Sequence, residues 1–167
     1  MAKKKLNPRH VPVSARSLSM DAIVDDAMKD DMLHAWLLVA DTLLEHEQIS
    51  SDEINEMYSS FHDFETTEAS VRHAERLMGT SKRPSPDIGP IATAADLKKL
   101  KARMKDLALH TALCMICLNL EESGRFTEED LKRIFLAADI TRAEIERGDE
   151  SYGHLEDKVL EQKVNVR

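Results

Sequence analysis

Apolar residues spaced three or four positions apart recur through most of this 167-residue chain, and this spacing constrains the fold more than any other feature. It places apolar side chains along one side of an α-helix, where they must pack against another element. Aromatic residues, which favour strands, make up only 4% of the chain. The pattern therefore predicts an all-α protein.

The first half of the chain is expected to form a helical hairpin, residues 19–78. Its first helix spans 19–47. The second follows Ser50, because Ser50 and Glu53 have the spacing of a capping box, and it ends at Gly79 in a left-handed conformation. Glu65 and Glu68 thin the apolar stripe in the middle of this second helix, which predicts a kink or break near residues 65–67.

Residues 79–92 hold three prolines and two glycines, which predicts a linker. The second hairpin, within 93–167, is expected to pair a helix after Thr93 with a helix after Thr127. A short C-terminal helix follows, and its thin apolar face predicts that the last residues fray. The stretch Leu107 to Leu118 is apolar nearly all round, so it is expected to form the buried centre of the fold.

The two hairpins resemble each other in sequence. Residues 33–54 align with residues 109–131 after one inserted position, and each segment reads as helix, tight turn and capped helix. Two helices alone bury an apolar face poorly, so the hairpins are predicted to pack together as a four-helix-bundle-like domain. The alternative is that two amphipathic hairpins align this well by chance.

Charge is distributed unevenly along the chain. Residues 1–19 contain five bases and no acid, and two prolines predict that 1–18 form an extended basic tail. Residues 20–79 contain fifteen acids and three bases, a net charge of −12. Residues 80–110 contain seven bases and three acids, a net charge of +4. The contrast suggests separate surfaces for oppositely charged partners, or a solubilising surface with a disordered terminus.

The acidic block leads to the first functional hypothesis. A non-enzymatic interaction module would dock an acidic helical surface on a basic partner protein, such as a nuclease or another nucleic-acid-binding protein. The residues predicted for this surface are Asp25, Asp26, Asp30, Asp31, Glu45 and Glu56.

Two alternatives remain open. A nucleic-acid-associated accessory protein would use the basic tail and the bases of 98–105. The residues predicted for that contact are Lys3, Lys4, Lys5, Arg9, Lys98, Lys101, Arg103 and Lys105. A structural homo-oligomer, including a homodimer, would instead pack Trp36 and Met-rich faces between subunits.

Enzymatic motifs find little support. Phosphate-binding glycine loops, a nucleophile elbow and the carboxylate–histidine spacings of metalloenzymes are missing from the sequence, so neither an enzyme nor a cofactor is expected. His110, Cys114 and Cys117 share one helical face and could bind metal with a fourth ligand such as His34, but buried structural thiols are the favoured interpretation. A helix-turn-helix within 131–147 is weighed against one continuous helix, which is favoured because Glu144 and Glu146 would repel phosphate.

The cysteines also bear on location. Cys114 and Cys117 lie in an apolar run, which suits a reducing cytosol, and the N-terminus lacks the apolar core of a signal peptide. We therefore expect a cytoplasmic protein. The longest apolar stretch is shorter than the roughly 20 residues that a membrane helix needs.

The opening KKKLNPRHVPVS, followed by a long acidic helix and a helix–turn–capped-helix unit, resembles small uncharacterised helical proteins of Firmicutes phages and mobile elements. The resemblance covers the tail and the general layout, and it carries over no catalytic residue. It implies a context in which accessory proteins bind a host or phage macromolecule, sometimes as inhibitors of host defence.

Overall fold

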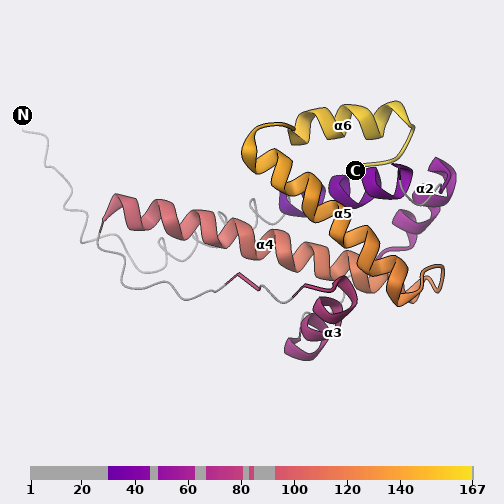
Figure 1. The fold of residues 1–167 in the computed structure, drawn as a ribbon, viewed down its shortest axis with the longest axis horizontal. Coiled ribbons are helices and arrows are strands. Elements are labelled where there is room, and N and C mark those ends of the chain that lie inside the picture. The colour runs from indigo at the N-terminus through magenta and orange to yellow at the C-terminus, as the bar shows by residue number, and fades with distance from the viewer. Residues whose placement is uncertain (1–29, 46–48, 63–66, 81–82, 85–92, 167) are drawn as a thin grey trace, which may run out of the picture.

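The computed structural model describes residues 30–45, 49–62, 67–80, 83–84 and 93–166, and the regular secondary structure within them is helical. The all-α prediction is confirmed, and the described residues contain no strand. Residues 30–45 form the first helical segment. The labelled helices are α2 (Ser51–Ser60), α3 (Glu68–Met78), α4 (Ala94–Glu122), α5 (Glu128–Arg147) and α6 (Tyr152–Glu161) (Figure 1).

Local sequence sets most of the helix ends. The capping box at Ser50 and Glu53 is confirmed, since the Ser50 hydroxyl accepts from the Glu53 amide and the Glu53 carboxylate accepts from the Ser50 amide. Thr93 and Thr127 begin α4 and α5 with the same reciprocal bonds. Gly79 ends α3 at a φ of 69°, a left-handed conformation that glycine adopts without steric cost.

The core is built around two helices that are apolar on more than one side. Every residue from Ala35 to Leu43 is buried, including Trp36 and the polar pair Asp41 and Thr42. In α4, burial is concentrated between Leu109 and Leu120, slightly later than the predicted centre. The stretches 35–43 and 109–120 are apolar on more than one side, so other helices pack around these parts of the two helices.

The helix predicted to run from Ser50 to Gly79 is interrupted, as the thinned stripe suggested. Helix α2 ends at Ser60, and α3 begins at Glu68. Asn119 of α4 holds the chain after α2, because its Oδ1 accepts from the His62 amide at 3.0 Å and its Nδ2 donates to the His62 carbonyl at 3.1 Å. These bonds replace the helical hydrogen bonds that His62 would make in a continuous helix.

Helix α3 packs against both α4 and α5, and α4 also contacts α5. The first half of α4 extends beyond the other described helices as an arm, whereas its second half lies within the body of the molecule (Figure 1). This arrangement does not establish a four-helix bundle or related hairpins, so both stay predictions. The predicted tail, 1–18, lies outside the described residues. Among the described helices, none combines the length with the apolar composition that a membrane span requires.

The C-terminal residues do not fray, contrary to the sequence-based expectation. Val164 and Val166 are buried, and the Asn165 amide donates to Oδ1 of Asn55 at 2.7 Å. Lys163 adopts a φ of 64°, which turns the chain after α6 back toward α2. The expectation was wrong because it considered the thin apolar face of α6 and not the residues that follow that helix.

Candidate functional site

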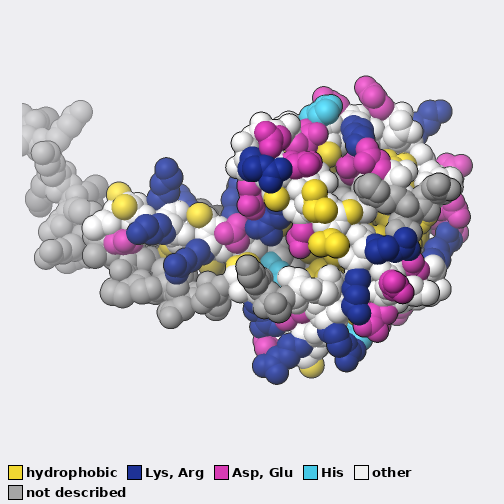
Figure 2. Space-filling view, viewed as in Figure 1, with side chains coloured by type: hydrophobic (Ala, Val, Ile, Leu, Met, Phe, Trp, Pro, Cys, Tyr) yellow, Lys and Arg dark blue, Asp and Glu magenta, His cyan; other side chains and the backbone are white. Residues whose placement is uncertain are grey.

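The exposed arm of α4 carries a concentration of positive charge. Lys98, Lys101 and Lys105 are separated by three and four positions, so they share one side of the helix, and all three are exposed. On the opposite side, Leu100 is buried. Figure 2 shows the dark blue side chains standing out along this arm. The structure therefore presents these bases to solvent and does not use their side of the helix for packing.

The bases of the arm have few acidic neighbours. Lys98 and Lys101 make no ion pair with another described residue. Lys105 lies close enough to Asp31 to oppose the rise in the pKa of that carboxyl. Arg103 is exposed on another side of the same helix. The remaining residues of this hypothesis, Lys3, Lys4, Lys5 and Arg9, lie outside the described residues.

The acidic residues predicted for a partner surface are dispersed. Asp30 is exposed, whereas Asp31 is only 3% exposed. Glu45 forms an ion pair with Lys158 of α6, and Glu56 binds Nη2 of Arg125 at 2.7 Å. Asp25 and Asp26 lie outside the described residues. Of the four described acids of this predicted surface, one is buried and two form ion pairs within the protein. Asp30 is the fourth, and it is exposed and takes no part in these two pairs.

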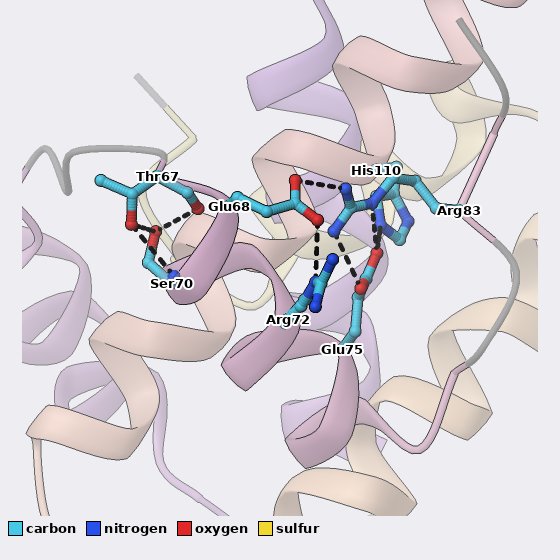
Figure 3. A network of polar contacts seen from close by, with 7 residues as sticks. All are labelled: Thr67, Glu68, Ser70, Arg72, Glu75, Arg83 and His110. Atoms are coloured by element: carbon cyan, nitrogen blue, oxygen red, sulfur yellow. Dashed lines mark hydrogen bonds and ion pairs between the residues drawn. The ribbon is translucent and has the colours of Figure 1, made fainter.

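A network of polar side chains that includes Glu68, Glu75, Arg83 and His110 joins α3, α4 and the segment after α3 (Figure 3). The guanidinium of Arg83 donates to both oxygens of Glu75, at 2.8 and 3.1 Å, and to Glu68 at 2.8 Å. Nε2 of His110 lies 2.9 Å from Oε1 of Glu75. Arg83, and to a lesser extent His110, hold the pKa of Glu75 below its usual range.

A surface pocket of about 410 Å³ lies beside this network. Its lining residues are Met78, Thr80, Arg83, Pro84, Asp106, His110, Phe135, Asp139 and Arg142. Both arginines are already neutralised, since Arg83 binds Glu75 and Glu68 while Arg142 contacts Asp106 and Glu146. The pocket therefore offers no free positive charge to an anion, and the network serves to hold the Arg83 segment against α3 and α4.

The cysteines behave as buried structural residues. Cys114 and Cys117 are 1% and 0% exposed. Burial raises the pKa of the Cys114 thiol to about 12 and also raises that of Cys117, so neither forms a reactive thiolate at neutral pH. His110 points instead to Glu75, and in the described part of the chain no three His, Cys, Asp or Glu side chains are grouped to hold a metal ion.

Two further sequence hypotheses can be placed on the structure. Trp36 is 1% exposed and stacks on Tyr58 with 4.6 Å between ring centroids, so it packs within the chain and is not available to a second subunit. Residues 131–147 belong to the single continuous helix α5, which excludes a helix-turn-helix at that position. His34, considered as a fourth metal ligand, stacks on Tyr152.

The Glu75–Arg83–His110 network was not anticipated from the sequence. In the sequence, Arg83 is one of the seven bases of residues 80–110, and His110 is considered only for its spacing to the cysteines. Glu75 and His110 are 35 positions apart, and no local pattern predicts which acid and which histidine will meet over such a separation. Comparison of the chain with protein-family models, curated proteins and solved structures gave no match.

Proposed function

We propose that this chain is a non-enzymatic binding module that contacts nucleic acid through the basic arm of α4. The observation that supports this most is the shared, exposed side of Lys98, Lys101 and Lys105. A helix rises about 1.5 Å per residue, so the three ammonium groups spread along roughly 10 Å of the arm. That spacing suits contact with successive phosphates of one strand, a contact that depends on charge and not on base sequence.

The basic arm is better suited to bind nucleic acid than the predicted acidic residues are to bind a basic protein. An ammonium group without a carboxylate partner keeps its full charge for a ligand, whereas an acid that is already paired must first give up that pair. No aromatic residue lies between the bases of 98–105, so the proposal involves phosphate contacts without base stacking. The basic residues of 1–18 would add to the same electrostatic contact.

The test is an electrophoretic mobility shift at low ionic strength, with single- and double-stranded DNA and RNA of random sequence. The full chain should retard at least one of these probes, and affinity should fall with salt with a log–log slope of about −2 to −3 for three phosphate contacts. The variant Lys98→Glu/Lys101→Glu/Lys105→Glu should lose retardation at every protein concentration at which the parent binds.

The matched control is Arg72→Glu/Lys132→Glu/Lys163→Glu, which changes net charge equally at exposed positions of α3, α5 and the C-terminal segment. It should bind nearly as the parent does, apart from a small general loss from its lower charge. Equal loss in both triple variants would show that net charge alone matters and would overturn the assignment to the arm. Absence of retardation with every probe would overturn the function itself.

A second candidate is the protein-docking module, for which the support is the net charge of −12 over residues 20–79 and the exposure of Asp30. A basic partner, such as a nuclease, would be attracted to this block. Cross-linking to such a partner should be weakened by Asp30→Lys and left unchanged by the triple variant of the arm. Cross-linking that Asp30→Lys leaves unchanged and that the triple variant of the arm weakens would favour the nucleic-acid function.

A further inference from the structure

Two large apolar side chains stand one turn apart on the outward side of α5. Leu136 is 63% exposed and Ile140 is 55% exposed. The inward side of the same helix buries Leu131, Ile134, Phe135 and Ala138, so packing of α5 on the body does not use the outward pair. Single exposed apolar residues are ordinary, but two at adjacent turns in the middle of a helix form a patch.

The patch lies on an open side of the molecule. Helix α5 crosses in front of α4, and no described helix lies over it in this view (Figure 1). In the space-filling view, hydrophobic side chains gather near the centre of the same side, along the line of α5 (Figure 2). The helix is also well defined at both ends, by the capping box at Thr127 and by the left-handed Gly148.

Charged residues flank the patch on both sides, and the residues at corresponding places on the two sides have opposite charges. Glu129 lies seven positions before Leu136, and Arg147 lies seven positions after Ile140. Closer to the patch, Arg133 precedes it and Glu144 follows it. At about 100° per residue, all four fall on the side that carries the patch. The outer pair, Glu129 and Arg147, therefore has opposite signs at equal distances of seven positions from the patch, and the inner pair, Arg133 and Glu144, has opposite signs at three and four positions.

From this order we propose that the outward side of α5 is the interface of an antiparallel homodimer. A two-fold axis would set Leu136 of one copy against Ile140 of the second copy. The same axis places Glu129 opposite Arg147 of the second copy, and it places Arg133 beside Glu144 of the second copy. A parallel arrangement would instead set Glu129 against Glu129 and Arg147 against Arg147, which repel.

The charge order is the reason to choose a second copy over an unrelated partner. A uniformly acidic or basic partner would meet one repulsive pair for each attractive pair along this side, whereas a second α5 meets attraction at both ends. Glu144 forms no ion pair with any other residue that the structure describes. Arg147 pairs with Asp149 at exposed positions, where such pairs hold weakly. Arg133 is itself exposed and pairs with Asp130, three positions before it.

The dimer is expected to be weak. One helix packed on another lies at the lower end of specific interfaces, about 1,200 Å² or less in total, so association should depend on protein concentration. The pair of aliphatic side chains supplies most of the attraction, and the charges mainly select the antiparallel direction.

Sedimentation velocity over a series of concentrations of the full chain tests the proposal. The sedimentation coefficient should rise from that of a monomer to that of a dimer. Leu136→Asp should weaken association at least about tenfold, because it places a charge in the apolar centre of the contact. The matched control Leu160→Asp, at a 48% exposed position on α6, should leave the dissociation constant unchanged. Circular dichroism verifies that each variant is folded.

Charge reversal tests the direction. Glu144→Arg alone should weaken the dimer about three- to tenfold, because it faces Arg133 of the second copy. The double variant Arg133→Glu/Glu144→Arg restores opposite charges and should return the dissociation constant to near its parent value. A monomer at all concentrations would overturn the proposal. A dimer that Leu136→Asp leaves intact would also overturn it. If the double variant Arg133→Glu/Glu144→Arg has a dissociation constant no lower than that of Glu144→Arg alone, the antiparallel direction is excluded.

Discussion

The indole Nε1 of Trp36 donates a hydrogen bond to the backbone carbonyl of Asn165, with 2.9 Å between nitrogen and oxygen. This bond connects the helical segment 30–45 with the end of the chain, 129 positions later. Val164 and Val166 are buried on either side of it. The C-terminal segment is thus attached to a helical segment whose residues 35–43 are all buried, and its attachment can be tested directly.

Asn55 makes two of the bonds that hold this segment. Its Nδ2 donates to the Lys163 carbonyl at 2.9 Å, and its Oδ1 accepts from the Asn165 amide at 2.7 Å. Asn55→Ala should lower the free energy of unfolding by about 1–2 kcal/mol, as measured by urea denaturation. Amide exchange at Asn165 should accelerate. Ser59→Ala, one turn later on α2, is the control; unchanged exchange in Asn55→Ala would contradict the role.

Asp31 is a second test, because its carboxyl is buried and its Oδ2 has no hydrogen-bond partner among the described residues. Burial raises the pKa of Asp31 from 3.8 to about 6. The folded state therefore holds this proton more tightly than the unfolded state does. The stability that protonation provides is complete below pH 4 and is lost as the pH rises through about 6.

Asp31→Asn, which stays neutral, should raise the free energy of unfolding by about 1–2 kcal/mol at pH 8 and change it little at pH 4. Urea denaturation at both pH values measures the difference. The exposed neighbour offers the control, Asp30→Asn, which should have a small effect at either pH. A gain for Asp31→Asn that is equal at the two pH values would show that ionisation is not its cause.

Glu75 has the opposite pH dependence. Arg83 and His110 lower the pKa of Glu75, so its ionised form stabilises the folded state. That contribution is present above the ordinary glutamate pKa of 4.5 and is lost as the pH falls through the lower folded value. Glu75→Gln should lower the free energy of unfolding by about 1 kcal/mol at pH 7.

The loss from Glu75→Gln should shrink in acid, where the parent also carries a neutral side chain. Thermal unfolding at pH 7 and at pH 3 would measure this. Glu128→Gln removes an exposed pair with Lys132 and should have a smaller effect at pH 7. A loss that persists undiminished at pH 3 would mean that Glu75 acts through packing and not through its charge.

The thiols of Cys114 and Cys117 should react slowly in the folded protein. Both are buried, and the pKa of Cys114 is raised to about 12, so a thiol reagent should modify them at least about tenfold more slowly than an exposed cysteine. Absorbance during reaction with an aromatic disulfide reports the rate. Ala102→Cys, on the exposed arm, supplies a fast-reacting reference, and urea should expose both native thiols. Two fast thiols in the native chain would contradict this burial.

Several features of the fold follow from local sequence. The capping residues Ser50, Thr93 and Thr127 and the left-handed Gly79 were predicted, because a cap depends on residues within one turn of the helix end. The interruption was predicted near residues 65–67, just before the start of α3 at Glu68, whereas α2 already ends at Ser60. Its position depends on Asn119, which is 57 positions away from the His62 backbone that it binds.

The candidate sites also include residues that could be predicted from the sequence and residues whose environment only the folded chain decides. The bases of 98–105 could be recognised in the sequence, since their helical spacing places them on the surface of a helix whose other side is apolar. The burial or pairing of the acids could not be inferred from the sequence. Asp31 lies near Lys105 and Asp106 of α4, and Glu45 and Glu56 meet Lys158 and Arg125, only in the folded chain.

The sequence by itself therefore determined that this protein is helical, where most helices begin and end, and which short segment concentrates positive charge. These properties arise from hydrogen bonds and side-chain spacings within a few residues. The tertiary structure alone decided which charges remain available, that Trp36 is enclosed by the C-terminal segment, and that Leu136 and Ile140 face outward. Those outcomes depend on contacts between segments separated by tens of residues, and a periodic pattern does not specify the partner of each side chain.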